Sequence, residues 1–263
     1  MNLLTPLIYG HYLIYFAGEP ADPLPMIQCI GRGELIEGKG RGGIALVRLN
    51  GQMLACRKYT HGGLLRAVTR DIFFSDRRAL SELGITGYLR DNGFPVVVPF
   101  AVIAEKKLLT KRLYILTVYM EGAVDLLQFL VSSSKMRRLR TIKRFAELLY
   151  KMEKLGVRHP DLHLNNVLVT RDRQLVFLDF DKCGRGIFTG RDTIRMIFRL
   201  NRHAEKMEKK GAAAFTQQER AMFLRAYHRI SGRDLYPEME RKAGSKKLLS
   251  RVGWLVERLL YGW

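Results

Sequence analysis

Residues 159–169 read HPDLHLNNVLV, and residues 175–181 read LVFLDFD. Each stretch combines a short run of strand-forming residues with acidic or amide side chains. The polar segment TRDRQ, residues 170–174, separates the two runs, so we predict a short hairpin. Polar groups at the mouth of a buried strand are costly unless something binds them. This stretch therefore indicates a binding site at the open end of the hairpin.

Three polar residues of this region carry the chemistry that we expect there. Asn166 follows Asp161 by five residues and precedes Asp179 by thirteen. Because the two segments flank one hairpin, we expect these side chains to converge, and their hard oxygen atoms suit Mg²⁺ together with phosphate oxygens. Asn166 and Asp179 are the predicted metal ligands, and Asp161 is the predicted base for a hydroxyl nucleophile. The alternative is a polar loop that merely caps the hairpin.

The composition is that of a globular protein with an anionic partner. The chain has 263 residues, of which 47% are hydrophobic and 27% charged, and its formal net charge is +20. Such a charge favours a nucleic acid, an anionic membrane face or a phosphorylated substrate as partner. A non-catalytic nucleic-acid-binding protein would explain the charge but not the grouping of Asp161, Asn166 and Asp179, so we expect no nucleic-acid partner.

The cysteines and the N-terminal stretch indicate a cytoplasmic protein. Cys29, Cys56 and Cys183 are far apart and show no CxxC spacing, so we expect neither a disulfide framework nor a zinc site. The apolar start, residues 1–20, is interrupted well before it could span a membrane. We expect it to form a core strand, with interfacial membrane contact as the alternative.

The first half of the chain is expected to be rich in strands. Residues 44–49 and 52–58 form two strand-like runs around Asn50-Gly51, the pair that best accepts a two-residue hairpin turn. The preceding segment 31–43 contains six glycines.

One helix and two further strands complete the expected first half, and helices dominate the second half. Ser75 is the predicted N-cap of a helix over 75–93. Strand-like runs come next at 95–105 and 112–120, and the later helical stretches are 123–131, 134–156, 191–210, 216–230 and 244–263.

The polar residues around the predicted hairpin at 167–177 resemble the catalytic loop and metal-binding motif of the protein-kinase-like fold. The matching patterns are H-x-D-L-x-x-x-N at 159–166 and D-F at 179–180. The resemblance implies an α+β, two-lobed fold, with a β-rich N-lobe at 1–120 and a helical C-lobe at 121–263. It also implies ATP and Mg²⁺ as cofactors.

The same resemblance assigns contacts with the nucleotide to the N-terminal half. Gly38, Gly40 and Gly43 stand where a glycine-rich loop would cover the phosphates. The segment LTVYMEGAVDL resembles the hinge between the lobes, and it implies that the backbone of Val118 and Met120 hydrogen-bonds adenine.

A strand residue and a cation are the other expected nucleotide contacts. Ala55 and Arg57 lie on one face of their strand because side chains alternate, and the resemblance places Ala55 under adenine. Arg57 then takes the place of the lysine that binds phosphates in kinases, with Lys58 as the alternative. Glu82, on the following helix, is the candidate to hold that cation.

A closer resemblance is to the lipopolysaccharide kinase family, which includes the 3-deoxy-D-manno-octulosonic acid (Kdo) kinases and the core heptose kinases. No A-P-E triplet of a protein kinase follows Asp179. The similar stretches cover about residues 31–200, and they are GRGELIEGKGRGG (31–43), CRKYTHGGLLR (56–66), SELGITGYLRDNGFPVVVP (81–99) and HPDLHLNNVLV with LDFDKC (159–169 and 178–183).

This resemblance implies ATP-dependent transfer to a sugar hydroxyl, of Kdo or heptose, in the lipopolysaccharide inner core. Two residues depart from the family pattern: Val97 stands where the family often has a second proline, and Pro160 lies between His159 and the expected catalytic residue Asp161. These departures leave undecided which sugar is phosphorylated. His159 is expected to support the loop, and Asp181, where most kinases have glycine, receives no role. A small-molecule kinase or an atypical protein kinase of the same fold is the alternative function.

The resemblance also implies which anionic partner the positive charge of the protein would bind. Residues 134–158 include nine basic and two acidic side chains, and residues 182–211 include nine basic and three acidic side chains. Such surfaces suit lipid A phosphates and the anionic inner face of the inner membrane. We therefore expect a cytoplasmic protein that is peripheral at that membrane. The basic amphipathic segment 246–263 either lies on the membrane or packs on the helical lobe.

Overall fold

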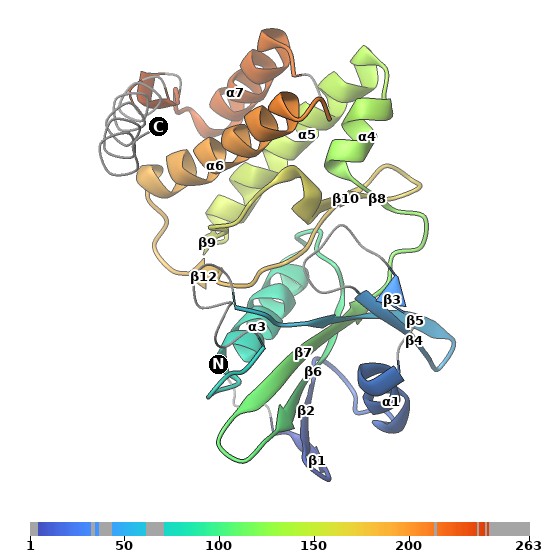
Figure 1. Cartoon of the computed structure of the whole chain (residues 1–263). Coiled ribbons are helices and arrows are strands. Elements are labelled where there is room, and N and C mark those ends of the chain that lie inside the picture. The colour runs from blue at the N-terminus through green and yellow to red at the C-terminus, as the bar shows by residue number, and fades with distance from the viewer. Residues whose placement is uncertain are drawn as a thin grey trace, which may run out of the picture. The chain divides into compact units, whose positions relative to one another are not determined.

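The computed structural model describes residues 5–32, 35–36, 44–61, 71–212, 215–235, 237–239 and 241. These residues form two compact units, one within Met1–Phe129 and Asn165–Gly186 and the other within Leu130–Leu164 and Ile187–Trp263. Figure 1 shows an α+β fold with a β-rich N-terminal part and a helical C-terminal part, which confirms the predicted fold class. The predicted lobe boundary, 1–120 and 121–263, stays a prediction.

A seven-stranded antiparallel sheet is the scaffold of the first unit (Figure 1). The strands lie in the order β1-β2-β6-β7-β5-β4-β3. Their bounds are Leu7–Tyr9 for β1, Tyr12–Phe16 for β2, Leu35–Ile36 for β3, Ile44–Leu49 for β4, Gln52–Lys58 for β5, Pro99–Lys106 for β6 and Lys111–Val118 for β7.

Local sequence determines the β4–β5 hairpin. Its turn residues, Asn50 and Gly51, have φ angles of 48° and 78°, the left-handed values that this pair accepts readily. The strand bounds and the turn agree with the sequence prediction. Residues of β5 alternate across the sheet, with Leu54 and Cys56 in one core cluster.

The N-terminal stretch differs in part from its prediction. β2 is mostly buried and belongs to the core, as expected, whereas all three residues of β1 are exposed because β1 is the edge strand. The sequence predicted one helix in this half, and the structure contains a second, α1 (Leu24–Arg32). Asp22 accepts a hydrogen bond from the Leu24 N–H, and Met26 and Cys29 pack into the core.

Helix α3 (Arg77–Asp91) packs on the other face of the sheet. Ala79 and Leu83 join a core cluster with alternate residues of the strands, including Leu113 and Ile115. The N-cap of α3 is Asp76 and not Ser75, the predicted cap. The Ser75 hydroxyl instead accepts a hydrogen bond from the Arg77 N–H at 3.1 Å.

The predicted short hairpin is present in the first unit as β10 (Val167–Val169) and β11 (Leu175–Phe177). The segment that follows α3 pairs with β11, because the Val97 N–H donates to the Phe177 carbonyl at 3.0 Å. A proline at position 97 has no N–H and would lose this bond. The smaller elements are β8 (Val124–Asp125), η1 (Leu164–Asn166) and β12 (Gly184–Arg185), and α4 (Leu126–Ser132) runs from the first unit into the second.

The second unit is helical. Besides β9 (Val157–Arg158), it contains α5 (Lys135–Lys154), α6 (Gly190–Lys209) and α7 (Gln217–Ser231). The aromatic rings of Phe145 on α5 and Phe223 on α7 lie 6.0 Å apart between their centroids. None of the helices in the described part of the chain is long and apolar enough to cross a membrane. The predicted helix at 246–263 lies outside the described residues.

A buried ion pair joins α5 to the start of α7. Arg138 donates to both carboxylate oxygens of Glu219, at 2.5 and 2.9 Å, and Glu219 is 5% exposed. Glu219 also forms a capping box with Thr216, whose N–H donates to the carboxylate at 2.8 Å. One carboxylate therefore supports both the helix end and the helix packing.

Substitution of Glu219 should separate these two contributions. Glu219→Gln retains a capping-box side chain but loses the charge, so we expect the free energy of unfolding to fall by about 1.5 kcal/mol. Glu219→Ala also removes the cap and leaves Arg138 without this carboxylate, so we expect a loss of about 3 kcal/mol or more. Urea unfolding of the two variants and the wild type at neutral pH measures both values.

The loss in Glu219→Gln should depend on pH. Burial raises the pKa of Glu219, but the hydrogen bonds and charge of Arg138 outweigh it, so the pKa lies below its usual 4.5. The charged form therefore stabilises the fold at neutral pH, and this contribution is lost as the pH falls through the lowered pKa. A stability difference that does not narrow in acid would contradict this assignment.

Candidate active site

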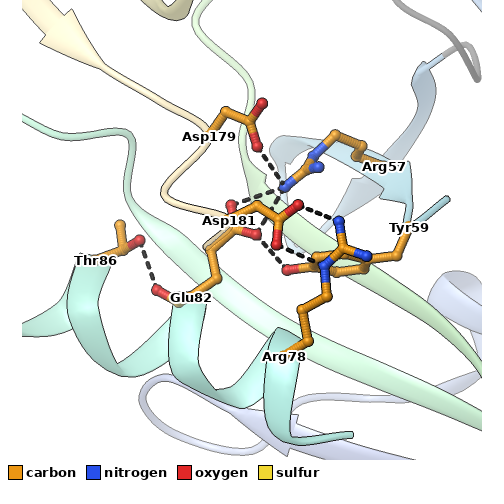
Figure 2. A network of polar contacts seen from close by, with 7 residues as sticks. All are labelled: Arg57, Tyr59, Arg78, Glu82, Thr86, Asp179 and Asp181. Atoms are coloured by element: carbon orange, nitrogen blue, oxygen red, sulfur yellow. Dashed lines mark hydrogen bonds and ion pairs between the residues drawn. The ribbon is translucent and has the colours of Figure 1, made fainter. Parts of the chain in front are cut away.

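Glu82 of α3 is the centre of a buried polar network in the first unit (Figure 2). The carboxylate is 4% exposed and accepts hydrogen bonds from one nitrogen of Arg57, at 2.7 and 2.8 Å. The Tyr59 hydroxyl donates to the same carboxylate, and the Thr86 hydroxyl donates to the Glu82 carbonyl at 2.8 Å. The ion pair between Arg57 and Glu82 that the sequence predicted is therefore present.

The electrostatics of this network follow from burial. Burial raises the pKa of Glu82, and the charge of Arg57 opposes that shift without cancelling it. Burial also lowers the pKa of Arg57, but the carboxylates of Glu82 and Asp179 outweigh it and raise the pKa overall. The charge of each partner therefore favours the charged form of the other, and Glu82 is the more deeply buried of the two, with side-chain exposures of 5% for Glu82 and 32% for Arg57.

The structure distinguishes the two candidate cations on β5. Arg57 pairs with Glu82, whereas Lys58 forms an ion pair with Asp71. This difference arises because neighbouring strand residues point to opposite faces of the sheet. Ala55, two residues before Arg57, is half-buried on the Arg57 side of β5.

Asp179 follows the hairpin in an uncommon backbone conformation. Its φ angle is 63°, a left-handed value that asparagine and aspartate tolerate better than most residues. One carboxylate oxygen, Oδ1, lies 3.3 Å from a nitrogen of Arg57 (Figure 2). The same oxygen is buried and makes no hydrogen bond. A buried carboxylate oxygen in this state suits a bound cation.

Asn166 and Asp179 lie at the same end of the hairpin, and the convergence of their side chains stays a prediction. Asn166 is 5% exposed, and its carbonyl accepts a hydrogen bond from the N–H of Leu178 at 3.0 Å. No group of three or more His, Cys, Asp or Glu side chains that could hold a metal ion occurs in the described ranges. One amide and one carboxylate fit Mg²⁺, which commonly takes its remaining ligands from phosphate and water.

Asp181 forms a second ion pair with α3, which the sequence did not predict. Arg78 donates through Nε to Oδ1 at 2.6 Å and through Nη2 to Oδ2, so the pair is bidentate. The guanidinium groups of Arg57 and Arg78 lie 4.9 and 5.6 Å from the centroid of the Tyr59 ring. The available signal was the spacing on α3, since Arg78 precedes Glu82 by four residues and shares its helix face.

In the second unit, Pro160 belongs to a tight turn that carries Asp161. The Leu162 N–H donates to the His159 carbonyl at 3.4 Å, and His159 is fully buried. Pro160 is the second residue of this turn, the position where the fixed φ of proline is favoured. The proline that distinguishes this sequence therefore restricts the backbone next to the predicted base.

Helix α6 supplies the partner of Asp161. Arg199 donates to the Asp161 carboxylate, and the two side chains are 51% and 45% exposed. One turn later on α6, the ring of His203 stacks on His163, with 4.8 Å between the centroids. Sequence reasoning identified Asp161 but neither Arg199 nor His203, because no local pattern connects Asp161 with a residue that lies 38 positions later.

Several predicted nucleotide contacts remain predictions. Gly38, Gly40 and Gly43 lie outside the described residues. The Val118 N–H already donates to the Val98 carbonyl at 2.9 Å, and the Met120 carbonyl accepts from the Ala123 N–H at 3.2 Å. Adenine would have to use the other backbone atoms of this segment or share these.

The chain is similar to known proteins over most of its length. Residues 32–227 match the lipopolysaccharide kinase (Kdo/WaaP) family. A 3-deoxy-D-manno-octulosonic acid kinase of Vibrio vulnificus is 30% identical over 148 residues, which cover 55% of this chain and 62% of the relative. One from Xylella fastidiosa is 25% identical over 229 residues, 86% of each chain.

The family match covers more than half of the chain and includes β5, α3, the predicted catalytic loop and the predicted metal motif. The alignment with the Vibrio relatives spans less than two thirds of their length. On the strength of the family match, the chain belongs to the lipopolysaccharide kinase (Kdo/WaaP) family.

Proposed function

We propose that this protein is an ATP-dependent kinase that phosphorylates a sugar hydroxyl of the lipopolysaccharide inner core, with Kdo as the first candidate acceptor. The network of Arg57, Glu82 and Asp179 carries the proposal, because it places a cation that could bind phosphates beside a carboxylate whose buried Oδ1 makes no hydrogen bond and suits a metal ion. The relatives from Vibrio and Xylella are named Kdo kinases, which favours Kdo over heptose.

The chain's own residues would hold the nucleotide in position for transfer. Phosphoryl transfer depends on positioning and charge neutralisation more than on covalent catalysis. Arg57, oriented by Glu82, would bind the phosphates that are not transferred. Asn166 and Asp179 would hold Mg²⁺, which neutralises charge on the phosphates when bound.

Asp161 would orient the acceptor hydroxyl and accept its proton as the oxygen attacks. The Pro160 turn limits the backbone freedom of Asp161, and Arg199 holds its carboxylate. A lipopolysaccharide acceptor also accounts for the basic outer surfaces of α5 and α6, since lipid A phosphates and inner-leaflet lipids are anionic. We therefore propose a peripheral position at the cytoplasmic face of the inner membrane.

The acceptor can be identified by loss of one phosphate from cellular lipopolysaccharide. We expect mass spectrometry of the core from cells with Asp161→Asn to show a species one phosphate lighter, with the difference located on Kdo. Cells with Asp91→Asn, the same change at a 67% exposed side chain, should retain the phosphate. A phosphate lost from heptose would change the acceptor, and an unaltered core in Asp161→Asn cells would reject the proposed function.

Asp179→Asn should remove the response of the protein to Mg²⁺. Removal of one such charged partner costs about 3 kcal/mol in the barrier, roughly a hundredfold or more in rate. In calorimetry, Mg²⁺ should strengthen ATP binding to the wild type but not to the variant, whose ATP affinity without metal should be at least as high. Near-normal turnover of folded Asp179→Asn protein would show that the metal assignment is wrong.

The ion pair between Arg78 and Asp181 should hold the predicted metal segment, residues 179–181, against α3. We expect Arg78→Glu and Asp181→Arg each to lower kcat by roughly tenfold to a hundredfold, and the double variant to recover part of the loss. Steady-state kinetics with ATP, together with thermal unfolding of all three variants, measures this coupling. Losses that simply add in the double variant would argue against a positioning role.

A further inference from the structure

The turn between β6 and β7 exposes two adjacent leucines. The Lys107 N–H donates to the Thr110 carbonyl at 2.8 Å, so Leu108 and Leu109 form a two-residue loop. Leu108 is 99% exposed and Leu109 is 81% exposed. Figure 1 shows this turn projecting from the seven-stranded sheet at the end where β1 also lies.

The geometry of the turn does not require these leucines. The two-residue turn of the β4–β5 hairpin uses Asn50 and Gly51, with left-handed φ angles that suit a tight hairpin. Leu108 and Leu109 are not among the described residues with positive φ. Neither side chain gains stability from burial in this unit, and both expose apolar surface to water. A partner that covers them would account for both residues.

Other apolar side chains are exposed on both sides of the turn. Phe73 exchanges backbone hydrogen bonds with Lys111, at 2.8 and 2.6 Å, which brings Ile72 and Phe74 to the start of β7. The Lys106 N–H donates to the His11 carbonyl at 2.8 Å, which brings the β1–β2 turn to the end of β6. We define the sheet-end surface as the exposed residues Ile8, Tyr9, Ile72, Phe74, Leu108 and Leu109.

Basic side chains form the outer layer of charge around this surface. Lys107 pairs with Glu105 at 2.6 Å, and the lysine is 48% exposed whereas the carboxylate is 9% exposed. Arg112 pairs with Asp71 at 3.2 Å. Here too the cation is the more exposed partner, with 42% of the Arg112 side chain exposed and 18% of the Asp71 side chain. Lys106 is exposed as well. The carboxylates lie beneath the cations, so a flat partner would meet positive charge first.

We propose that the sheet-end surface docks on a bilayer that contains anionic lipid, with Leu108 and Leu109 entering the headgroup region. Protruding apolar side chains beside the cations Lys106, Lys107 and Arg112 match the apolar and anionic layers of such a bilayer. A projecting turn also suits a deformable lipid surface better than a preformed protein groove.

The register of the sheet connects this contact with the phosphate-binding cation. Arg57 on β5 pairs with Ile115 on β7, six residues from Leu109 and roughly 20 Å along the strand. Docking by the turn would therefore hold Arg57 within roughly 20 Å of the headgroup layer that carries a lipid-linked sugar. The relation to the acceptor rests on the proposed function, whereas the membrane contact itself does not.

Vesicle sedimentation of the full-length protein tests the contact. We expect the wild type to sediment with vesicles of phosphatidylethanolamine and phosphatidylglycerol, and to bind phosphatidylcholine vesicles more weakly. Leu108→Ser/Leu109→Ser should weaken binding at least tenfold, because the inserted apolar area is lost. Lys106→Gln/Lys107→Gln should reduce binding to anionic vesicles only. Ile187→Ser is the matched control, since Ile187 is 89% exposed outside the sheet-end surface.

Each result decides the proposal. Wild-type affinity of the double serine variant, with unchanged thermal unfolding, would overturn it. A wild-type dimer that the double serine variant disrupts would also overturn it, since a second copy would then cover the turn. Phosphorylation of lipid-free Kdo by the double serine variant should equal that of wild type. Inactivity of both proteins on any sugar, with the binding loss intact, would reject the proposed function but not the membrane contact.

Discussion

A buried carboxylate, Glu82, imposes the main physical constraint on the candidate site. A charge at 4% exposure is costly unless cations and hydrogen-bond donors surround it. Arg57 and Tyr59 at the end of β5 meet this need, and in doing so they join α3 to the sheet. The same nitrogen of Arg57 lies near Asp179, so one buried charge in α3 links the sheet, the helix and the predicted metal segment.

Sequence could predict the parts of the site that depend on residues close together in the chain. Asn50-Gly51 determines its hairpin by backbone preference, and strand alternation places Arg57 on the face opposite Leu54 and Cys56. The predicted catalytic and metal motifs combine residue type with fixed spacing, and because a short hairpin joins them, residues at a fixed spacing in the sequence also lie at a fixed end of the hairpin. Such features need little knowledge of how distant segments pack.

The parts that sequence missed depend on tertiary placement. Arg78 and Asp181 are 103 residues apart, and a chain with 45 basic residues offers many formally equivalent partners for any carboxylate. The pair of Arg199 with Asp161 is a similar case. Pro160 looked like an irregularity because its turn becomes evident only from the hydrogen bond that closes it. Helix α1 was missed because it is only nine residues long.

The bidentate pair of Arg78 and Asp181 has a consequence for inhibition. If the proposed function holds, a compound that entered behind the nucleotide would have to displace residues 179–181, the predicted metal segment, from α3. Here that movement would break a two-point ion pair, in addition to the contact between Arg57 and Asp179. Compounds for the proposed nucleotide site are therefore better designed against the segment as it lies here, with an anionic group directed at the guanidinium of Arg57.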